Sequence, residues 1–128
     1  MPFGTVVKSV RVGHNRSEDI AYSRGALWLA TPRDNAVTKL STSNPDPIPI
    51  SVGQFPRQLT VSRNTVYVTN YNSSDLTVID AKTSRVVGDP LEVSVSPFSL
   101  SVSADDKTLW VGSQPEDRLT RIATGRGG

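Results

Sequence analysis

The sequence predicts an all-β chain made of three β-propeller blades. A strand pattern with a central aromatic residue occurs three times, around Trp28, Tyr67 and Trp110, and each copy is followed by a polar turn and another strand. Trp28 and Tyr67 are 39 positions apart, and Tyr67 and Trp110 are 43 positions apart. A period of about 40 residues with several short strands in each repeat is typical of a propeller blade. Each blade is expected to be a sheet of four antiparallel strands.

Each blade is expected to begin with its innermost strand and to proceed outward. The innermost strands are predicted at residues 20–22, 59–61 and 100–102. The second strands, which hold the repeated aromatic residues, are predicted at residues 26–31, 65–70 and 108–113. The third strands are predicted at residues 36–40, 76–79 and 119–122. The outer strands are predicted at residues 47–52 and 85–93, with a further one at residues 5–12, before the first blade.

Residue types support these boundaries. β-branched and aromatic residues fill the predicted strands, whereas Gly, Pro, Asn, Asp and Ser fill the connections between them. Prolines in the segment 47–52 suit an edge strand, because proline cannot donate a hydrogen bond to a neighbouring strand. We therefore interpret residues 1–128 as a single three-blade unit, with repeats at about 13–52, 53–93 and 94–122.

The two ends of the unit each supply part of a blade. The segment 5–12 is an outer strand without a blade of its own, and the third blade lacks an outer strand. Three blades are fewer than the four to eight of a closed propeller. Two chains placed head to tail would close a six-bladed ring, each lending its first strand to the partner's third blade. The sequence thus favours a homodimer, with a cut piece of a longer propeller as the alternative.

Composition fits a folded chain and disfavours some partners. The 128 residues include 14 Lys and Arg and 12 Asp and Glu, and because these charges are interspersed, no basic run predicts nucleic-acid binding. Cysteine is absent, which rules out disulfides and thiolate metal sites. No apolar run is long enough to predict a membrane-spanning helix. The sequence contains no phosphate-binding glycine loop, nucleophile elbow or zinc spacing, so we expect no cofactor.

The segment 66–70, Val-Tyr-Val-Thr-Asn, resembles the motif that names the YVTN family of β-propeller repeats. Its flanks, residues 53–61 and 76–83, agree with that repeat, and residues 103–111 resemble the family's serine-proline-aspartate-glycine-lysine turn with departures at Ala104 and Asp106. The resemblance implies a propeller that serves as a binding, sensor or scaffold module in bacteria. It also favours an extracytoplasmic location, periplasmic or at the cell surface. A shared fold does not by itself carry a function.

Two alternatives remain open at this point. Residues 26–28 and 36–40 are also similar to repeats of virginiamycin B lyase, a propeller enzyme whose metal ion is held by histidine and glutamate. His14, the single histidine, would place two symmetric histidines in a dimer and could serve a metal-dependent lyase. A designed or excised half-propeller without an independent function is the second alternative. We expect a non-catalytic chain, because no catalytic pattern is present.

A binding site is expected where the loops gather at one face, around the central channel. These loops enter the innermost strands and join the second strands to the third. Binding residues are often carried on loops that a rigid scaffold positions. Aligning residues 20, 59 and 100 places Glu18, Arg57 and Phe98 at equivalent positions. The candidate residues for binding a protein segment or a small polar ligand are His14, Arg16, Glu18, Phe55, Arg57, Tyr71 and Phe98.

The repeated aromatic residues are interpreted as packing between blades. Trp28, Tyr67 and Trp110 occupy one repeat position in the middle of a strand, where both faces of a blade are covered by its neighbours. A stacking platform for a sugar or a base is the alternative. If Trp110 lies in the core, its replacement by alanine should cost about 3–5 kcal/mol of stability.

Overall fold

A computed structural model describes residues 4–5, 17–41, 43, 46–113 and 117–124. Its strands form three antiparallel sheets in chain order, which confirms the all-β, three-blade prediction. Blade 1 contains four strands: β1 (Asp19–Ser23), β2 (Ala26–Thr31), β3 (Ala36–Ser41) and β4 (Ile48–Ser51). Blade 2 contains five: β5 (Pro56–Ser62), β6 (Thr65–Asn70), β7 (Asp75–Asp80), β8 (Arg85–Val86) and β9 (Leu91–Glu92). Blade 3 contains, among the described residues, β10 (Pro97–Val102), β11 (Thr108–Ser113) and β12 (Arg118–Ala123).

The outer strand of blade 2 differs from the prediction. Residues 85–93 were expected to form one strand, but β8 and β9 are two short pieces that both pair with β7. Gly88 between them has φ +67°, and Pro90 cannot donate a backbone hydrogen bond. The chain therefore leaves the sheet between the two pieces. The predicted outer strand at 5–12 falls almost entirely outside the described residues.

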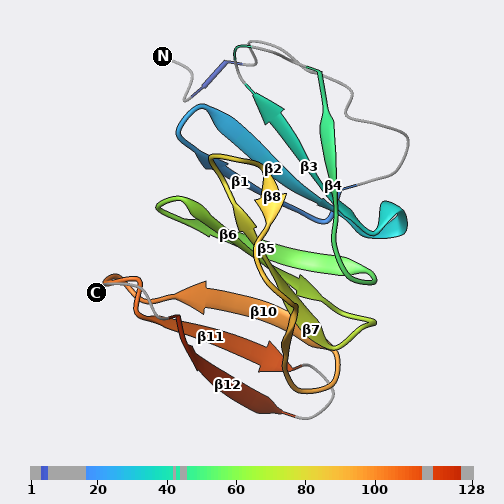
Figure 1. The fold of residues 1–128 in the computed structure, drawn as a ribbon, viewed down its shortest axis with the longest axis vertical. Helices are drawn as coiled ribbons and strands as arrows, with labels where there is room; N and C mark the ends of the chain where they lie inside the picture. The colour runs from blue at the N-terminus through green and yellow to red at the C-terminus, as the bar shows by residue number, and fades with distance from the viewer. Residues whose placement is uncertain (1–3, 6–16, 42, 44–45, 114–116, 125–128) are drawn as a thin grey trace.

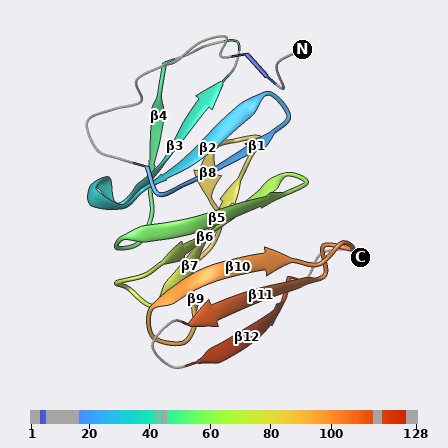
Figure 2. The same ribbon diagram turned by 180° about the vertical axis from the view of Figure 1, so that it is seen from behind.

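The blades stack side by side through their inner strands. β5 contacts both β1 and β10, and it lies between them in Figure 1 and, from behind, in Figure 2. Two apolar clusters fill the spaces between sheets. The first lies between blades 1 and 2 and includes Trp28, Val37 and Val66, and the second lies between blades 2 and 3 and includes Leu76 and Leu109. Burial of these apolar surfaces drives the stacking.

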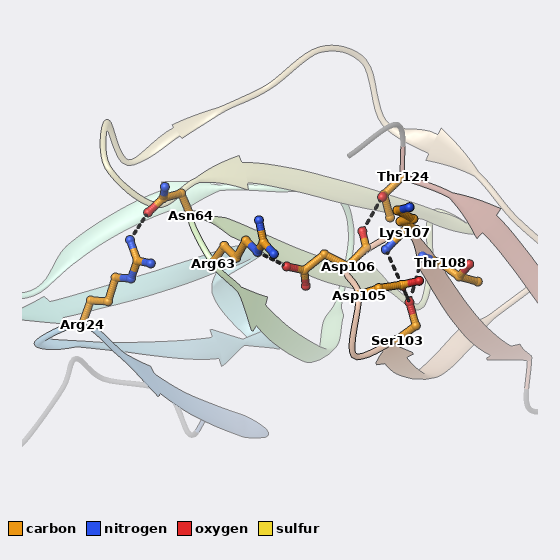
Figure 3. A network of polar contacts seen from close by, with 9 residues as sticks. All are labelled: Arg24, Arg63, Asn64, Ser103, Asp105, Asp106, Lys107, Thr108 and Thr124. Carbon is orange, nitrogen blue, oxygen red and sulfur yellow. Dashed lines mark hydrogen bonds and ion pairs between the residues drawn. The ribbon is translucent and has the colours of Figure 1, made fainter. Parts of the chain in front are cut away.

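The strand hairpins between the first and second strands gather at one end of the blades, which we call the turn face. Arg24 and Arg63 occupy the same position of two-residue turns in blades 1 and 2, with φ of 50° and 54°, and Asp106 in the longer turn of blade 3 also has a left-handed φ, 64°. Each turn contacts the next one (Figure 3): Arg24 donates to Asn64 Oδ1 at 2.7 Å, and Arg63 pairs with Asp106 at 2.5 Å. These contacts tie the three hairpins together in sequence order.

The third turn is also ordered internally. The Ser103 hydroxyl donates to Asp105 Oδ1 at 2.6 Å, and the Lys107 backbone N–H donates to the same oxygen at 3.0 Å. These two hydrogen bonds, the Ser103 one first, lower the pKa of the Asp105 carboxyl. A lowered pKa means that the ionised form favours the folded turn above the usual pKa of aspartate, and that this contribution is lost as the pH falls through the lowered value.

Candidate functional site

The opposite end of the blades, the loop face, holds most of the predicted site residues. The structure brings together Phe55, Arg57, Tyr71 and Phe98, which we call the loop-face cluster. Glu18 lies beside it, in a hollow of about 130 Å³ that it lines with Pro32, Arg33 and Phe55. His14 and Arg16 lie outside the described residues. The loop-face cluster joins residues of blade 2 to a residue of blade 3.

The centre of the loop-face cluster is the guanidinium group of Arg57. Its carbon lies 4.6 Å from the ring centre of Phe98, 5.2 Å from that of Tyr71 and 5.5 Å from that of Phe55. The Tyr71 ring makes edge contacts with both phenylalanines, with centroid separations of 6.5 Å to Phe55 and 6.3 Å to Phe98. A cation within about 6 Å of an aromatic ring is attracted by the ring's electron-rich face. Three rings thus hold one cation.

Irregular backbone explains why these side chains converge. The pairing of β5 with β6 shifts register between Pro56 and Leu59, and the pairing of β10 with β11 shifts between Pro97 and Ser99. Each shift adds one extra residue to the innermost strand: Arg57 and Gln58 together lie opposite Thr69, and Phe98 has no partner position in β11. A β-bulge redirects a side chain, and bulges are frequent beside functional sites.

Phe55 is held in an unusual conformation at the entry to blade 2. Its φ is 57°, a left-handed value that glycine adopts readily but that is uncommon for a bulky residue such as phenylalanine. Two hydrogen bonds hold it there: its N–H donates to Asn35 Oδ1 at 2.9 Å, and its carbonyl accepts from the Tyr71 N–H at 2.9 Å. Strain of this kind persists where surrounding contacts fix the backbone, and it is concentrated at functional sites.

Among the described residues, no carboxylate neutralises the charge of Arg57. Within the part of the chain that the structure describes, the one ion pair joins Arg63 to Asp106 on the turn face, and no carboxylate pairs with Arg57. The Arg57 side chain is partly buried. A partly buried guanidinium keeps planar donors that match the two oxygens of a carboxylate or a phosphate. The loop-face cluster can therefore receive an anionic group.

A larger hollow adjoins the cluster on the side of blade 3. It is an open cleft of about 360 Å³ that Phe98 lines together with Ser113, Asp117, Arg118 and Leu119. The two hollows adjoin the loop-face cluster, one at Phe55 and the other at Phe98, and each contains one arginine and one acidic residue. Arg33 and Arg118 were absent from the predicted site residues, although both lie in loops that the sequence assigns to this face.

The last two residues of the Val-Tyr-Val-Thr-Asn segment support the loop face from beneath. Thr69 is fully buried, and its hydroxyl lies 3.1 Å from the carbonyl oxygen of Phe98 and 3.1 Å from the N–H of Gln58. Asn70 is equally buried and donates to Asp75 and Thr77, at 2.8 Å each. Thr69 links blade 2 to blade 3, and Asn70 closes the loop that carries Tyr71.

The repeated aromatic residues do not share one environment. Trp28 and Tyr67 are 1% and 4% exposed and pack against the following blade, as expected. Trp110 is 43% exposed, so its predicted burial in the core is wrong for this chain. The physical reason is its place on the far face of blade 3, where the described chain supplies no following blade.

The described residues contain no group of three or more His, Cys, Asp or Glu side chains placed to hold a metal ion. They also contain no helix that is long and apolar enough to cross a membrane.

The fold and the loop face define a unit of three β-propeller blades. No family model matches the chain. Over 63 residues, or 49% of its length, the chain is 40% identical to the "Uncharacterized protein YncE" of Salmonella typhi and, equally, to that of Salmonella typhimurium strain LT2. This match spans only 18% of the length of those relatives.

Solved structures of larger chains share the fold. The hydrazine synthase of Kuenenia stuttgartiensis matches 96% of this chain and 37% of its own, with a TM-score of 0.80 and 20% identity. A functionally unknown protein from Desulfotomaculum acetoxidans DSM 771 matches 91% of this chain and 44% of its own, with a TM-score of 0.71 and 14% identity. The computationally designed Ika8 protein matches 83% of this chain and 36% of its own, with a TM-score of 0.62 and 14% identity. At these identities the likeness concerns the fold alone.

Proposed function

We propose that this chain is a non-catalytic β-propeller module that binds a protein segment or a small polar ligand at its loop face. The observation that carries the proposal is the Arg57 guanidinium, which three aromatic rings surround and which no described carboxylate neutralises. The rings hold the side chain in place before a ligand arrives, so less conformational entropy is lost on binding. We expect the ligand to present an anionic group to Arg57.

The surroundings of Arg57 suit an extended ligand. The hollow beside Phe55 adjoins the loop-face cluster and contains the charged side chains of Glu18 and Arg33. A peptide could place a carboxylate at Arg57 and a neighbouring residue in this hollow. We also propose that the repeats are of the YVTN type, which the motif at residues 66–70 supports.

Replacing Arg57 with glutamine should weaken ligand binding by about tenfold or more, because a hydrogen bond to a charged group contributes about 1.5–3 kcal/mol. The measurement uses an array of immobilised hexapeptides that carry zero to three glutamates, probed with the fluorescently labelled chain. Binding should rise with glutamate content and fall in the Arg57→Gln variant. Arg85→Gln, an exposed change in β8, is the matched control and should leave binding unchanged. Equal binding by both variants would contradict the proposal.

We further propose that two copies close a six-bladed ring head to tail. The open face of blade 3 supports this: Leu119 is 73% exposed, whereas Val37 and Leu76, its counterparts in blades 1 and 2, are fully buried by the next blade. The open face of blade 1 also exposes apolar side chains, with Ile20 at 57% and Tyr22 at 64%. Each face has the composition of a blade-to-blade contact, and the two would meet in a ring.

Replacing Leu119 with glutamate should convert the proposed dimer into a monomer, because a carboxylate buried between blades would lose its hydration without gaining a partner. The mass in solution, measured by light scattering after size exclusion over a dilution series, checks this. Val87→Glu changes another exposed aliphatic residue, 51% exposed, away from the blade faces and should leave the dimer intact. A wild-type chain that is monomeric at every concentration would overturn the proposal.

A further inference from the structure

We propose that the turn face carries a second binding site, for a small oxyanion such as phosphate, between blades 1 and 2. The site is a pocket of about 210 Å³. Its lining includes the basic side chains of Arg24, Lys39, Arg63 and Lys82, together with Trp28 and Asn64. It lies at the opposite end of the strands from the loop-face cluster, so the two sites are independent.

The positive charge of this pocket is only partly compensated. Arg63 pairs with Asp106 of blade 3 and is therefore neutralised. Arg24, Lys39 and Lys82 have no carboxylate partner within the described ranges of the chain. Asp80 is the acid closest along the chain to Lys82; its Oδ1 accepts the backbone N–H groups of Lys82 and Thr83 at 2.8 and 3.2 Å, and among the described residues it forms no ion pair with a cation of the pocket. Three uncompensated cations around one small pocket favour an anion.

Lys39 is fixed in a position that points to a ligand. Its ammonium group donates to the carbonyl of Ala81 at 3.2 Å and to Ser84 Oγ at 2.9 Å, and it lies 4.9 Å from the ring centre of Trp28. Two of its three donor hydrogens are thus used to bridge blade 1 to blade 2. One remains for another acceptor.

A neutral donor completes the set. Arg24 donates to Oδ1 of Asn64, as Figure 3 shows, and this contact leaves the Asn64 side-chain NH₂ group as a donor. The Trp28 side chain also lines the pocket, but it is only 1% exposed and its indole N–H is buried. Trp28 therefore forms part of the pocket wall and reports on a bound ligand without donating to it.

The pocket offers hydrogen-bond donors on cationic and amide side chains, so the ligand that fits it is an anion with several acceptor oxygens. Phosphate offers four oxygens, and its size suits a pocket of 210 Å³. The turns limit the site to this junction: Arg24 and Arg63 share a turn position in blades 1 and 2, whereas the longer third turn presents Asp106, which pairs with Arg63.

The test uses the two tryptophans as probes in ¹H–¹⁵N spectra, during titration with inorganic phosphate at constant ionic strength. The Trp28 indole signal should shift and saturate, whereas that of Trp110, on the far face of blade 3, should not. Replacing both Arg24 and Lys82 with glutamine, two exposed side chains, should raise the titration midpoint about tenfold or more. Arg85→Gln, which removes one positive charge outside the pocket lining, serves as the control and should leave the midpoint unchanged.

The outcomes separate a built site from general ion effects. A shift that sodium chloride reproduces at equal ionic strength, or one that the double variant retains at the same midpoint, would overturn the proposal. The absence of a saturable Trp28 shift would do the same. The remaining amide signals show whether the double variant is folded, and its peptide binding at Arg57 should be unaffected.

Discussion

Replacing Trp28 with alanine should lower the free energy of unfolding by about 3–5 kcal/mol, the range for removing a buried aromatic side chain. Trp28 lies in the first apolar cluster, between blades 1 and 2, and is 1% exposed. Its removal would open a cavity there, because packed sheets relax only in part. It would also remove the ring against which the Lys39 ammonium lies. Urea unfolding followed by circular dichroism measures the loss.

Trp110→Ala is the control for this prediction, since the two tryptophans occupy the same repeat position. Because Trp110 is 43% exposed, we expect its replacement to cost about 1 kcal/mol, the centre of the range for point substitutions. Both changes are best made in the Leu119→Glu background, so that association between copies does not contribute to stability. Equal losses of unfolding free energy for Trp28→Ala and Trp110→Ala would contradict the difference in burial between the two tryptophans.

Replacing Thr69 with valine should cost about 2–3 kcal/mol, although the two side chains have nearly the same shape. The buried hydroxyl donates at 3.1 Å to the carbonyl of Phe98 in blade 3 and accepts at 3.1 Å from the N–H of Gln58. Valine leaves both partly buried backbone groups without this partner, and leaving a buried group unsatisfied costs about 1–3 kcal/mol. The same urea titration measures the effect.

Thr60→Val is the matched control for Thr69→Val. Thr60 lies in β5 and is only partly buried. Its replacement should change stability by no more than about 0.5 kcal/mol, as is usual for positions without a special contact. If Thr69→Val proved as mild as this control, the hydroxyl would not be a link between blades 2 and 3. Because Phe98 belongs to the loop-face cluster, Thr69→Val should also weaken peptide binding.

The periodicity of the sequence was enough to predict the blades, because each repeat places aromatic and β-branched residues at the same strand positions. Two features depend on contacts that periodicity does not report. The segment 85–93 reads as one strand, yet Gly88 and Pro90 make the chain leave the sheet. Trp110 reads as core, yet its burial depends on a neighbour beyond blade 3 rather than on its own blade.

The candidate site, too, was predicted in part from repeat positions, while the rest of it depends on packing contacts. Equivalent repeat positions predicted that Arg57 and Phe98 would share a face. In the structure, the guanidinium carbon of Arg57 lies 4.6 Å from the ring centre of Phe98. The packing of three rings around the guanidinium could not be foreseen, since it depends on two bulges and on the left-handed backbone of Phe55. The turn-face pocket was missed because Arg24, Lys39 and Lys82 come from separate segments that meet only when two blades stack.

The position of blade 2 between two neighbours has a consequence for how the chain opens. Both of its faces are covered, whereas blades 1 and 3 each leave apolar side chains in contact with water. In a linear stack the stability of each unit depends on its own packing and on its interfaces with adjacent units. In a chain kept monomeric by Leu119→Glu, local unfolding should therefore start in blades 1 and 3 and reach β6 of blade 2 last.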